Sequence, residues 1–402
     1  MLLEIFLAIE LGILIGIFTG LSPGIHINLI ASILLASISN QLFSSIQPLS
    51  LALFIVSLSI THTIIDFIPS IYLGAPEEDT FLSILPGHQL MKQGLAHTAF
   101  ILTMYGALVA IPIILIYTPI FIKFLPIIFT STKAIMPFLL IFISFYLIFR
   151  EEKNLASIFI FFLAGILGFL TFNLPVKEPL LPLLSGLFGL SGLFLSLNTT
   201  TKPEKQIITP LKNITLSKEE LLKSSISAFL IAPFFSFLPG LGSGHATTIS
   251  SELFNLKTKS FLFVNGAVNT IIMSLSFVTV YTIGKSRTGS AATVLELLNK
   301  ITRDDLLIIL VTIIIVAIIS FVIGIYLSKL AANFINIINY KALTICVITM
   351  IILVNLLLSN WLGLLVLITS TSLGIFTIQS NSRRINLMAA LIVPAIVYYL
   401  MN

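Results

Sequence analysis

Residues 20–26 read Gly20-Leu21-Ser22-Pro23-Gly24-Ile25-His26, and residues 237–245 read Phe237-Leu238-Pro239-Gly240-Leu241-Gly242-Ser243-Gly244-His245. Proline lacks the N–H that a helix needs, and glycine permits backbone conformations that other residues avoid. Each stretch therefore predicts a broken helix within an apolar run. In hydrocarbon, non-helical backbone survives only where protein or a water-filled cavity surrounds it. We therefore expect both breaks to line one internal cavity.

The rest of the chain has the composition of a membrane protein. Of its 402 residues, 57% are hydrophobic and 9% are charged, with a mean hydropathy of +1.12. That apolar content exceeds what a globular core can bury. A spanning helix needs about 20 mainly apolar residues, and we find about fourteen apolar stretches. The sequence predicts an all-α, multi-pass protein of the plasma membrane with about 12–14 membrane segments.

A polar stretch divides these segments into two sets of seven. Residues 1–198 form an N-terminal membrane repeat, residues 199–223 a polar linker and residues 224–402 a C-terminal membrane repeat. The predicted segments are 3–21, 25–39, 49–73, 96–118, 120–149, 155–172 and 179–198, then 224–238, 245–256, 260–284, 305–329, 331–358, 361–379 and 385–401.

Short similarities between the two halves indicate a duplication. The end of the third segment, Ile71-Tyr72-Leu73-Gly74, corresponds to Tyr281-Thr282-Ile283-Gly284, and Leu167-Gly168-Phe169 corresponds to Leu373-Gly374-Ile375. These pairs follow in the same order as the two breaks. An odd number of spans in each half would turn the second half upside down, which gives the inverted repeat of many secondary transporters.

The resumed helix after each break presents unpaired N–H groups and a partial positive charge, which suit an anion. Glycines let a ligand approach the backbone closely. The alternative is an ordinary helical turn at the membrane surface, but the recurrence of the break favours a binding site. Its predicted residues are Ser22, Pro23, Gly24, His26 and Asn28, then Pro239, Gly240, Gly242, Ser243, Gly244, His245, Thr247 and Thr248.

Further polar residues are candidates for coupling transport to Na⁺ or H⁺, or for anion binding. Ionisable residues inside a membrane are functional candidates by default. His62 with Asp66, Glu252, and the pair Asn265 and Asn269 are the coupling candidates, although each can also serve packing or reach the interface. Lys285 and Arg287 lie in a hydroxyl-rich loop that suits an anionic group or marks topology.

Several function classes find no support. Lys and Arg are scattered among loops despite the net charge of +5, which argues against a nucleic-acid partner. The histidine spacing matches no metal ligand set, and no nucleotide or hydrolase motif occurs, so we expect no metal, no resident cofactor and no enzyme activity. The stripe of Gly12, Gly16 and Gly20 indicates close helix packing.

The paired breaks, and the run from Pro69 through Gly74-Ala75-Pro76 to Leu85-Pro86-Gly87-His88 with Lys92 and Gly94, resemble the TctA-type permease family. That family is the large membrane subunit of tripartite tricarboxylate transporters, and the likeness is strongest to its shorter archaeal-type branch. The resemblance implies a carboxylate transporter driven by an ion gradient. In bacterial members it also implies a soluble binding protein and a small membrane subunit.

We therefore expect a secondary transporter of a small anionic, carboxylate-type solute that works by alternating access. One alternative is a flippase for polyprenyl phosphate, a lipid carrier whose headgroup is also anionic. Another is an intramembrane enzyme that uses His with an acid. Expected partners are the anionic solute or lipid phosphate, membrane lipids, a small membrane subunit or binding protein, and further copies of the chain.

Overall fold

Every regular element that the structure describes is helical. The computed structural model describes residues 2–22, 27–39, 46–74, 84–132, 135–151, 154–197, 204–335 and 340–401. Eight stretches in these ranges are long and apolar enough to cross a membrane, and three shorter apolar helices are Met136–Phe149, Leu180–Leu195 and Gly289–Leu298. The predicted class, an all-α polytopic membrane protein, is confirmed.

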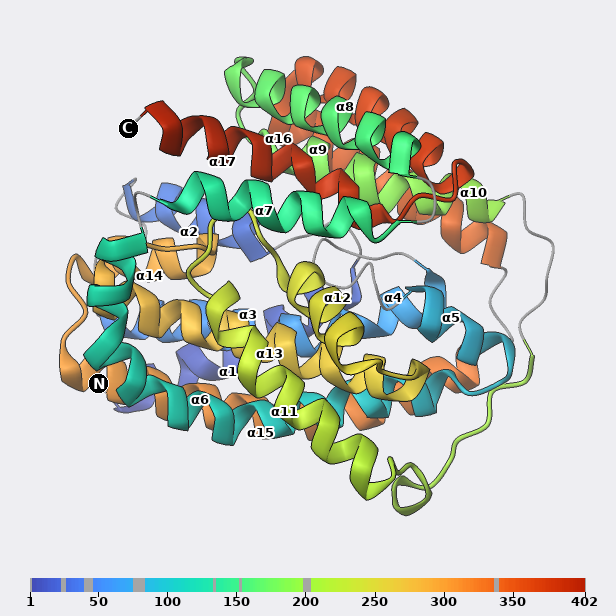
Figure 1. The fold of residues 1–402 in the computed structure, drawn as a ribbon. Helices are drawn as coiled ribbons and strands as arrows, with labels where there is room; N and C mark the ends of the chain where they lie inside the picture. Colours follow the sequence, from blue (N-terminus) through green and yellow to red (C-terminus); the bar gives the residue numbers. More distant parts are fainter. Residues whose placement is uncertain are drawn as a thin grey trace.

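The helices of each half follow in a fixed order (Figure 1). The first half contains α1 (Leu2–Leu21), α2 (Ile27–Ser39), α3 (Pro48–Ile65), α4 (Phe67–Leu73), α5 (Ile84–Lys92), α6 (Ala96–Thr132), α7 (Met136–Phe149), α8 (Asn154–Asn173), α9 (Leu180–Leu184), the π-helix η3 (Ser185–Leu190) and α10 (Ser191–Leu197). After the linker come α11 (Lys218–Phe235), α12 (Ser243–Phe254), α13 (Thr258–Ile283), α14 (Gly289–Leu298), α15 (Arg303–Phe334), α16 (Tyr340–Gln379), the 3₁₀ turn η5 (Arg384–Met388) and α17 (Ala389–Met401).

These helices form two layers, each built from both halves. Figure 1 shows α7–α10, α16 and α17 above the remaining helices. We call this upper group the α16 layer. The lower group, α1–α6 with α11–α15, is the α13 layer. In the α13 layer, α6 of the first half packs along α13 of the second, and in the α16 layer α8 packs along α17. Neither half therefore forms a separate body.

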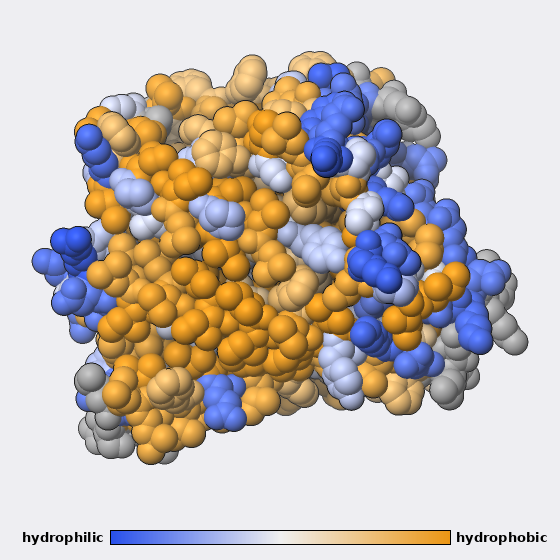
Figure 2. Space-filling view, turned by 90° about the horizontal axis from the view of Figure 1, so that it is seen from below, coloured by the Kyte–Doolittle hydropathy of each residue, from blue (hydrophilic) through white to orange (hydrophobic). Residues whose placement is uncertain are grey.

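The outer surface of the α13 layer is apolar between two hydrophilic edges. Figure 2, which views the molecule from below, shows a broad hydrophobic face with hydrophilic residues gathered at its left and right borders. Large side chains such as Leu14 on α1 and Val322 on α15 are more than half exposed there. So broad an apolar face would be unstable in water and is typical of a surface that faces lipid.

Glycines set the closest helix contacts. The predicted stripe is confirmed as packing, because a Cβ on Gly12 or Gly16 would lie 2.7 Å from a Cβ of α3. Contacts of this stripe advance in the same direction along both helices, so α1 and α3 run parallel. The end of α1 therefore lies beside Ile65, where Gly20 packs against it.

The sequence similarities between the halves correspond to similar local structures. Gly74 and Gly284 both end a helix in the left-handed conformation, with φ of 62° and 63°. A Cβ on Gly168 would lie 1.9 Å from the carbonyl oxygen of Ala390, and one on Gly374 would lie 2.5 Å from that of Leu187. Each of these two glycines thus packs against an element of the opposite half. The duplication remains a prediction that these contacts support.

Several predicted boundaries were wrong. Residue 119 does not divide two segments, because α6 continues through Pro112, Pro119 and Pro126 to Thr132 and the chain breaks before α7. The loops after Gly74 and Gly284 contain α5 and α14, two short helices that hydropathy alone did not separate. By contrast, the expected break between 358 and 361 is present as a kink at Asn360, whose φ is 62°.

The linker between the halves ends earlier than expected and is bound to the first half. Ser217 and Glu220 form a capping box, so α11 begins at Lys218 rather than at 224. Upstream, the N–H of Ile207 donates to the carbonyl oxygen of Gly94 at 2.7 Å. Gln206 accepts from the N–H of Ala96 at 3.0 Å. The described part of the linker is therefore a strap along α5 and α6.

The crossing of α6 and α13 should not tolerate a side chain. A Cβ on Gly266 would lie 2.0 Å from the carbonyl oxygen of Thr103, a backbone atom that cannot move alone. We expect Gly266→Ala to destabilise the folded protein by about 3 kcal/mol or more, because overpacking there separates two helices. Thermal unfolding in detergent measures this loss. Gly189→Ala is the control, since its Cβ would meet only Ile351 Cδ1 at 3.9 Å. Equal melting temperatures for both variants would contradict the close crossing.

Candidate functional site

The first break lies largely outside the described residues. Pro23, Gly24 and His26 are not described, and neither is the side chain of Asn28. Ser22 ends the described part of this arm, half-buried, with its N–H donating to the carbonyl oxygen of Thr19 at 3.2 Å. Because α1 runs parallel to α3, the first break begins at the level of Asp66.

His62, on α3, and Asp66, just after α3, lie at this level. The His62 ring is 2% exposed, and its Nδ1 lies 2.9 Å from Oγ1 of Thr19 on α1. Asp66 is 3% exposed and separates α3 from α4. Pro69 explains that interruption, because it cannot donate to the carbonyl four residues earlier. The structure therefore brings both predicted coupling residues beside the first break.

The second break is fully described. The helix α11 ends at Phe235, and α12 begins at Ser243 after a turn in which Gly240 has φ of +71°. A Cβ on Gly240 would meet the Cα of Ile392 on α17 at 3.2 Å. Only glycine therefore fits this turn without strain. The contact places the second break at the boundary between the two layers.

His245 is a helix cap in this conformation. Its Nδ1 accepts the backbone N–H of Gly242 at 3.1 Å, and its side chain is 1% exposed. The neutral ring then carries its proton on Nε2. Sequence reasoning placed His245 correctly in the break but did not foresee the capping bond, which takes one of its two ring nitrogens.

Two asparagines of α13 face the start of α12. Thr247 donates to Oδ1 of Asn265 at 3.1 Å. A three-residue connection joins α12 to α13, so the two helices form an antiparallel hairpin. In such a hairpin, a residue one turn later on α13 lies opposite a residue one turn earlier on α12. Because Asn265 lies opposite Thr247, Asn269 lies level with Ser243.

The side-chain amide nitrogens of both asparagines lack acceptors. Asn265 is 0% exposed and Asn269 is 2% exposed, and in each the Nδ2 atom has no hydrogen-bond acceptor. Leaving such a buried donor unpaired costs about 1–3 kcal/mol. They lie beside the first turn of a helix, whose own N–H groups also favour negative charge. The arrangement is suited to an acceptor such as a carboxylate.

The loop before α14 brings a positive charge to this region. Arg287 is close enough to His245 for its charge to act on the imidazole. Lys285 is exposed and its Nζ lies 5.2 Å from the centre of the Phe129 ring, so it contacts α6 in this conformation. The helix that follows this loop, α14, packs against α2 of the first half.

Glu252 takes part in a charge cluster that sequence reasoning did not foresee. Its Oε1 accepts from Nη1 of Arg383 at 2.5 Å, and its Oε2 lies 3.8 Å from Nε of Arg150. Glu151 is the second carboxylate of the cluster, with Oε1 3.8 Å from Nε of Arg383. The signal in the sequence was four charges near the ends of apolar segments, but hydropathy placed Glu252 inside the segment 245–256 and the other three charges between segments.

The remaining predicted site residues lie in the turn and on α12. Ser243 and Thr247 are 0% exposed, and Thr248 donates to the carbonyl oxygen of Gly244 at 2.9 Å. Pro239 is half-buried in the turn, and Gly242 and Gly244 are buried. All of these predicted residues therefore lie on one interrupted helix beside α13.

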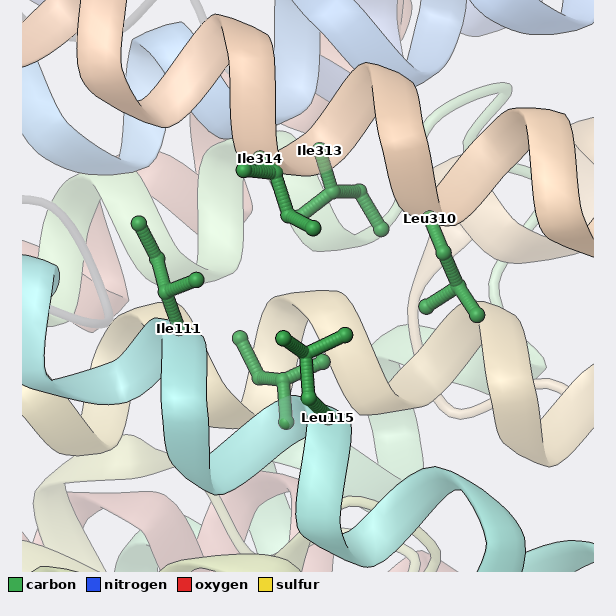
Figure 3. Close-up of a pocket in the computed structure, with 6 residues that line it drawn as sticks. Ile111, Leu115, Leu310, Ile313 and Ile314 are labelled. Atoms are coloured by element: carbon green, nitrogen blue, oxygen red, sulfur yellow. The ribbon is translucent and has the colours of Figure 1, made fainter.

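A separate pocket between α6 and α15 has a different chemistry. Figure 3 shows aliphatic side chains around this shallow hollow, which has essentially no room for a water molecule. Its lining contains no nitrogen or oxygen side-chain atom, so an anion would find no partner there. The residues that line it are Ile111, Ile114, Leu115, Leu310, Ile313 and Ile314.

Comparison with known proteins gives a family match over almost the whole chain. The tripartite tricarboxylate transporter TctA family matches residues 6–389. An uncharacterized protein of Methanocaldococcus jannaschii is 29% identical over 405 residues, which cover 97% of this chain and 98% of that protein. No solved structure matches the chain.

Burial raises the pKa of the Glu151 carboxyl above its ordinary value, although Arg383 lies beside it. A raised pKa means that the folded state binds the proton more tightly than the unfolded state. Its stabilising contribution is present at low pH and is lost as pH rises through the raised pKa. Glu151→Gln imitates the protonated form. We expect this variant to melt at or above the temperature of the unmodified protein at about pH 7.5, with the gap closing near pH 4.5.

Thermal unfolding at both pH values, with the exposed Glu296→Gln as control, measures this difference. A Glu151→Gln variant that melts several degrees below both proteins at the higher pH would contradict the expectation. It would show that the contact of the charged carboxylate with Arg383 outweighs the cost of burial.

Proposed function

The chain belongs to the tripartite tricarboxylate transporter TctA family, and on that premise we propose that it carries a small carboxylate across the membrane by alternating access. Membership makes it a component of a transporter. Its long apolar helices make it a multi-pass protein of the cell membrane. The identity of the solute, the mechanism and the driving ion are the proposed parts.

The observation that carries the proposal is the set of unpaired donors beside the second break. The amides of Asn265 and Asn269 are buried without acceptors at the level where α12 begins. A carboxylate has two oxygens and about four lone-pair sites. It could accept from the two amides, and Arg287 adds a favourable charge nearby.

The placement of the helix ends supports alternating access by an inverted pair of hairpins. Gln47, just before α3, donates its N–H to Glu4 at the start of α1 at 2.7 Å, and we call this level the open end of the α1–α2 pair. At the open end of the α11–α12 hairpin, Lys257 Nζ lies 3.2 Å from Glu220 Oε1. The segment α3–α4 begins at the first open end and finishes at Gly74, which lies near Gly192 and Arg384.

Arg383, the residue before Arg384, binds Glu252 beside the second open end. The two hairpins therefore have their open ends at opposite ends of α3–α4. We propose that they enter the membrane from opposite sides as re-entrant elements. This is the arrangement that lets two halves exchange conformations and expose one site alternately to each side.

We further propose an ion gradient as the driving force. His62 and Asp66 beside the first break are the candidates for H⁺, since an imidazole and a carboxylate can each bind a proton. The side-chain oxygens of Asn265 and Thr247 are the candidates for Na⁺. A small membrane subunit, a soluble binding protein and further copies of the chain are proposed partners on the strength of the family alone.

Uptake into proteoliposomes tests the function directly. Labelled mono-, di- and tricarboxylates and a polyprenyl phosphate are offered with a Na⁺ gradient, a proton gradient or neither. We expect saturable uptake of a carboxylate that one of the gradients accelerates. Transfer of the polyprenyl phosphate without carboxylate uptake would replace the proposal with a lipid flippase.

Loss of one amide should weaken solute binding. We expect Asn269→Ala to raise KM by about tenfold or more, because a hydrogen bond to a charged group is worth about 1.5–3 kcal/mol. Asn355→Ala is the matched control. Asn355 is a fully buried asparagine of α16, and its Nδ2 donates to the carbonyl oxygen of Ile351 at 2.8 Å. Equal KM values in the two variants, with both proteins folded, would remove Asn269 from the site.

A further inference from the structure

A charge cluster joins the two layers at the open end of the α11–α12 hairpin. Glu252, on the last turn of α12, belongs to the α13 layer. Arg150 follows α7 and Arg383 precedes η5, so both belong to the α16 layer. Nη1 of Arg383 donates to Glu252 at 2.5 Å, and Nε of Arg150 lies 3.8 Å from the other carboxylate oxygen. One acidic side chain of α12 is thus bound by two cations of the opposite layer.

Contacts within the α16 layer hold Arg383 in place for this interaction. Its backbone N–H donates to Glu151 at 3.3 Å, and its Nη2 donates to the carbonyl oxygen of Arg150 at 3.2 Å. Asn386 donates to the second oxygen of Glu151 at 3.1 Å. The guanidinium is therefore oriented by its own layer, and its bond to Glu252 is the part that crosses the boundary.

The exposure of these groups allows the contact to open. The side chains of Glu252 and Glu151 are 15% and 4% exposed, whereas those of Arg383 and Arg150 are 42% and 54% exposed. Buried ion pairs are hard to separate, and fully exposed pairs contribute little. This network is half-buried and water can reach its cations. The energy needed to separate it therefore lies between that of a buried pair and that of an exposed pair.

We infer that the bonds from Glu252 to Arg383 and Arg150 form a lock that holds α12 against the α16 layer in one state of the transport cycle. The inference rests on the proposed function, because alternating access requires the hairpin that bears the binding residues to change its position against the opposite layer. The second break also touches α17 through Gly240 and Ile392 in this arrangement. Movement of α12 must therefore separate two contacts with the α16 layer, the packing of Gly240 against Ile392 and the ion pairs of Glu252.

The test measures the distance between the two layers. Cys346, the single cysteine of the chain, is replaced by serine. Spin labels are then placed on cysteines at Lys259, an exposed residue at the start of α13, and at Leu155, which is 84% exposed on α8. We expect Glu252→Gln to increase the population of a second distance about fivefold or more, a shift typical of a coupling between two states.

Glu296→Gln on α14, an exposed acid without a described ion pair, is the matched control and should leave the distances unchanged. Arg383→Gln should give the same shift as Glu252→Gln. The double variant should add little to either single variant, because both remove one interaction. A Glu252→Gln distribution identical to that of Glu296→Gln, or fully additive effects in the double variant, would overturn the lock.

The same samples separate this inference from the proposed function. Uptake of the carboxylate panel by the unmodified protein decides whether the chain is a carboxylate transporter. The distance distribution decides whether Glu252 holds the layers together. Uptake with no shift in Glu252→Gln would overturn the lock and leave the transporter in place, whereas a shift without uptake would support the lock and refute the proposed solute class.

Discussion

The rest of the structure depends on one requirement, that every backbone polar group at membrane depth must find a partner or an enclosed polar space. The break between α11 and α12 leaves N–H and C=O groups outside any helical ladder. Protein surrounds it on several sides, with α13 along one side and α17 against Gly240. His245 satisfies one freed N–H, that of Gly242. The unpaired amide nitrogens of Asn265 and Asn269 lie on the side of α13.

The two-layer architecture follows from how the halves exchange elements. Gly168 of α8 fits against α17, and Gly374 of α16 fits against η3, so each half completes the α16 layer with a helix of the other. In the α13 layer, Gly106 and Gly266 allow α6 and α13 to touch through their backbones. Contacts this close need small residues on both helices. The boundary between the layers is consequently where the break, Gly240 and the Arg383 cluster all lie.

Sequence alone predicted the membrane class, the positions of most helices and the matched ends at Gly74 and Gly284, because hydropathy and glycine chemistry are local properties. It failed where a result depended on contacts distant in the chain. The capping role of His245 requires the turn geometry at Gly242, and the pairing of Glu252 with Arg383 joins residues 131 positions apart. The helices α5 and α14 were missed because they are short and follow helix-ending glycines. That Asn269 lies level with Ser243 follows only from the hairpin of α12 and α13, which the sequence does not show.

Solute protection of a cysteine at Ser243 tests the central claim most directly. Ser243 begins α12 and is fully buried, so a water-soluble thiol reagent can reach it only when the site opens. With Cys346 replaced by serine, Ser243→Cys in proteoliposomes should react slowly with a membrane-impermeant reagent, and a transported carboxylate should slow that reaction further. A cysteine that never reacts in the folded protein, or that reacts at one rate whatever carboxylate is present, would contradict a carboxylate site at the broken helix.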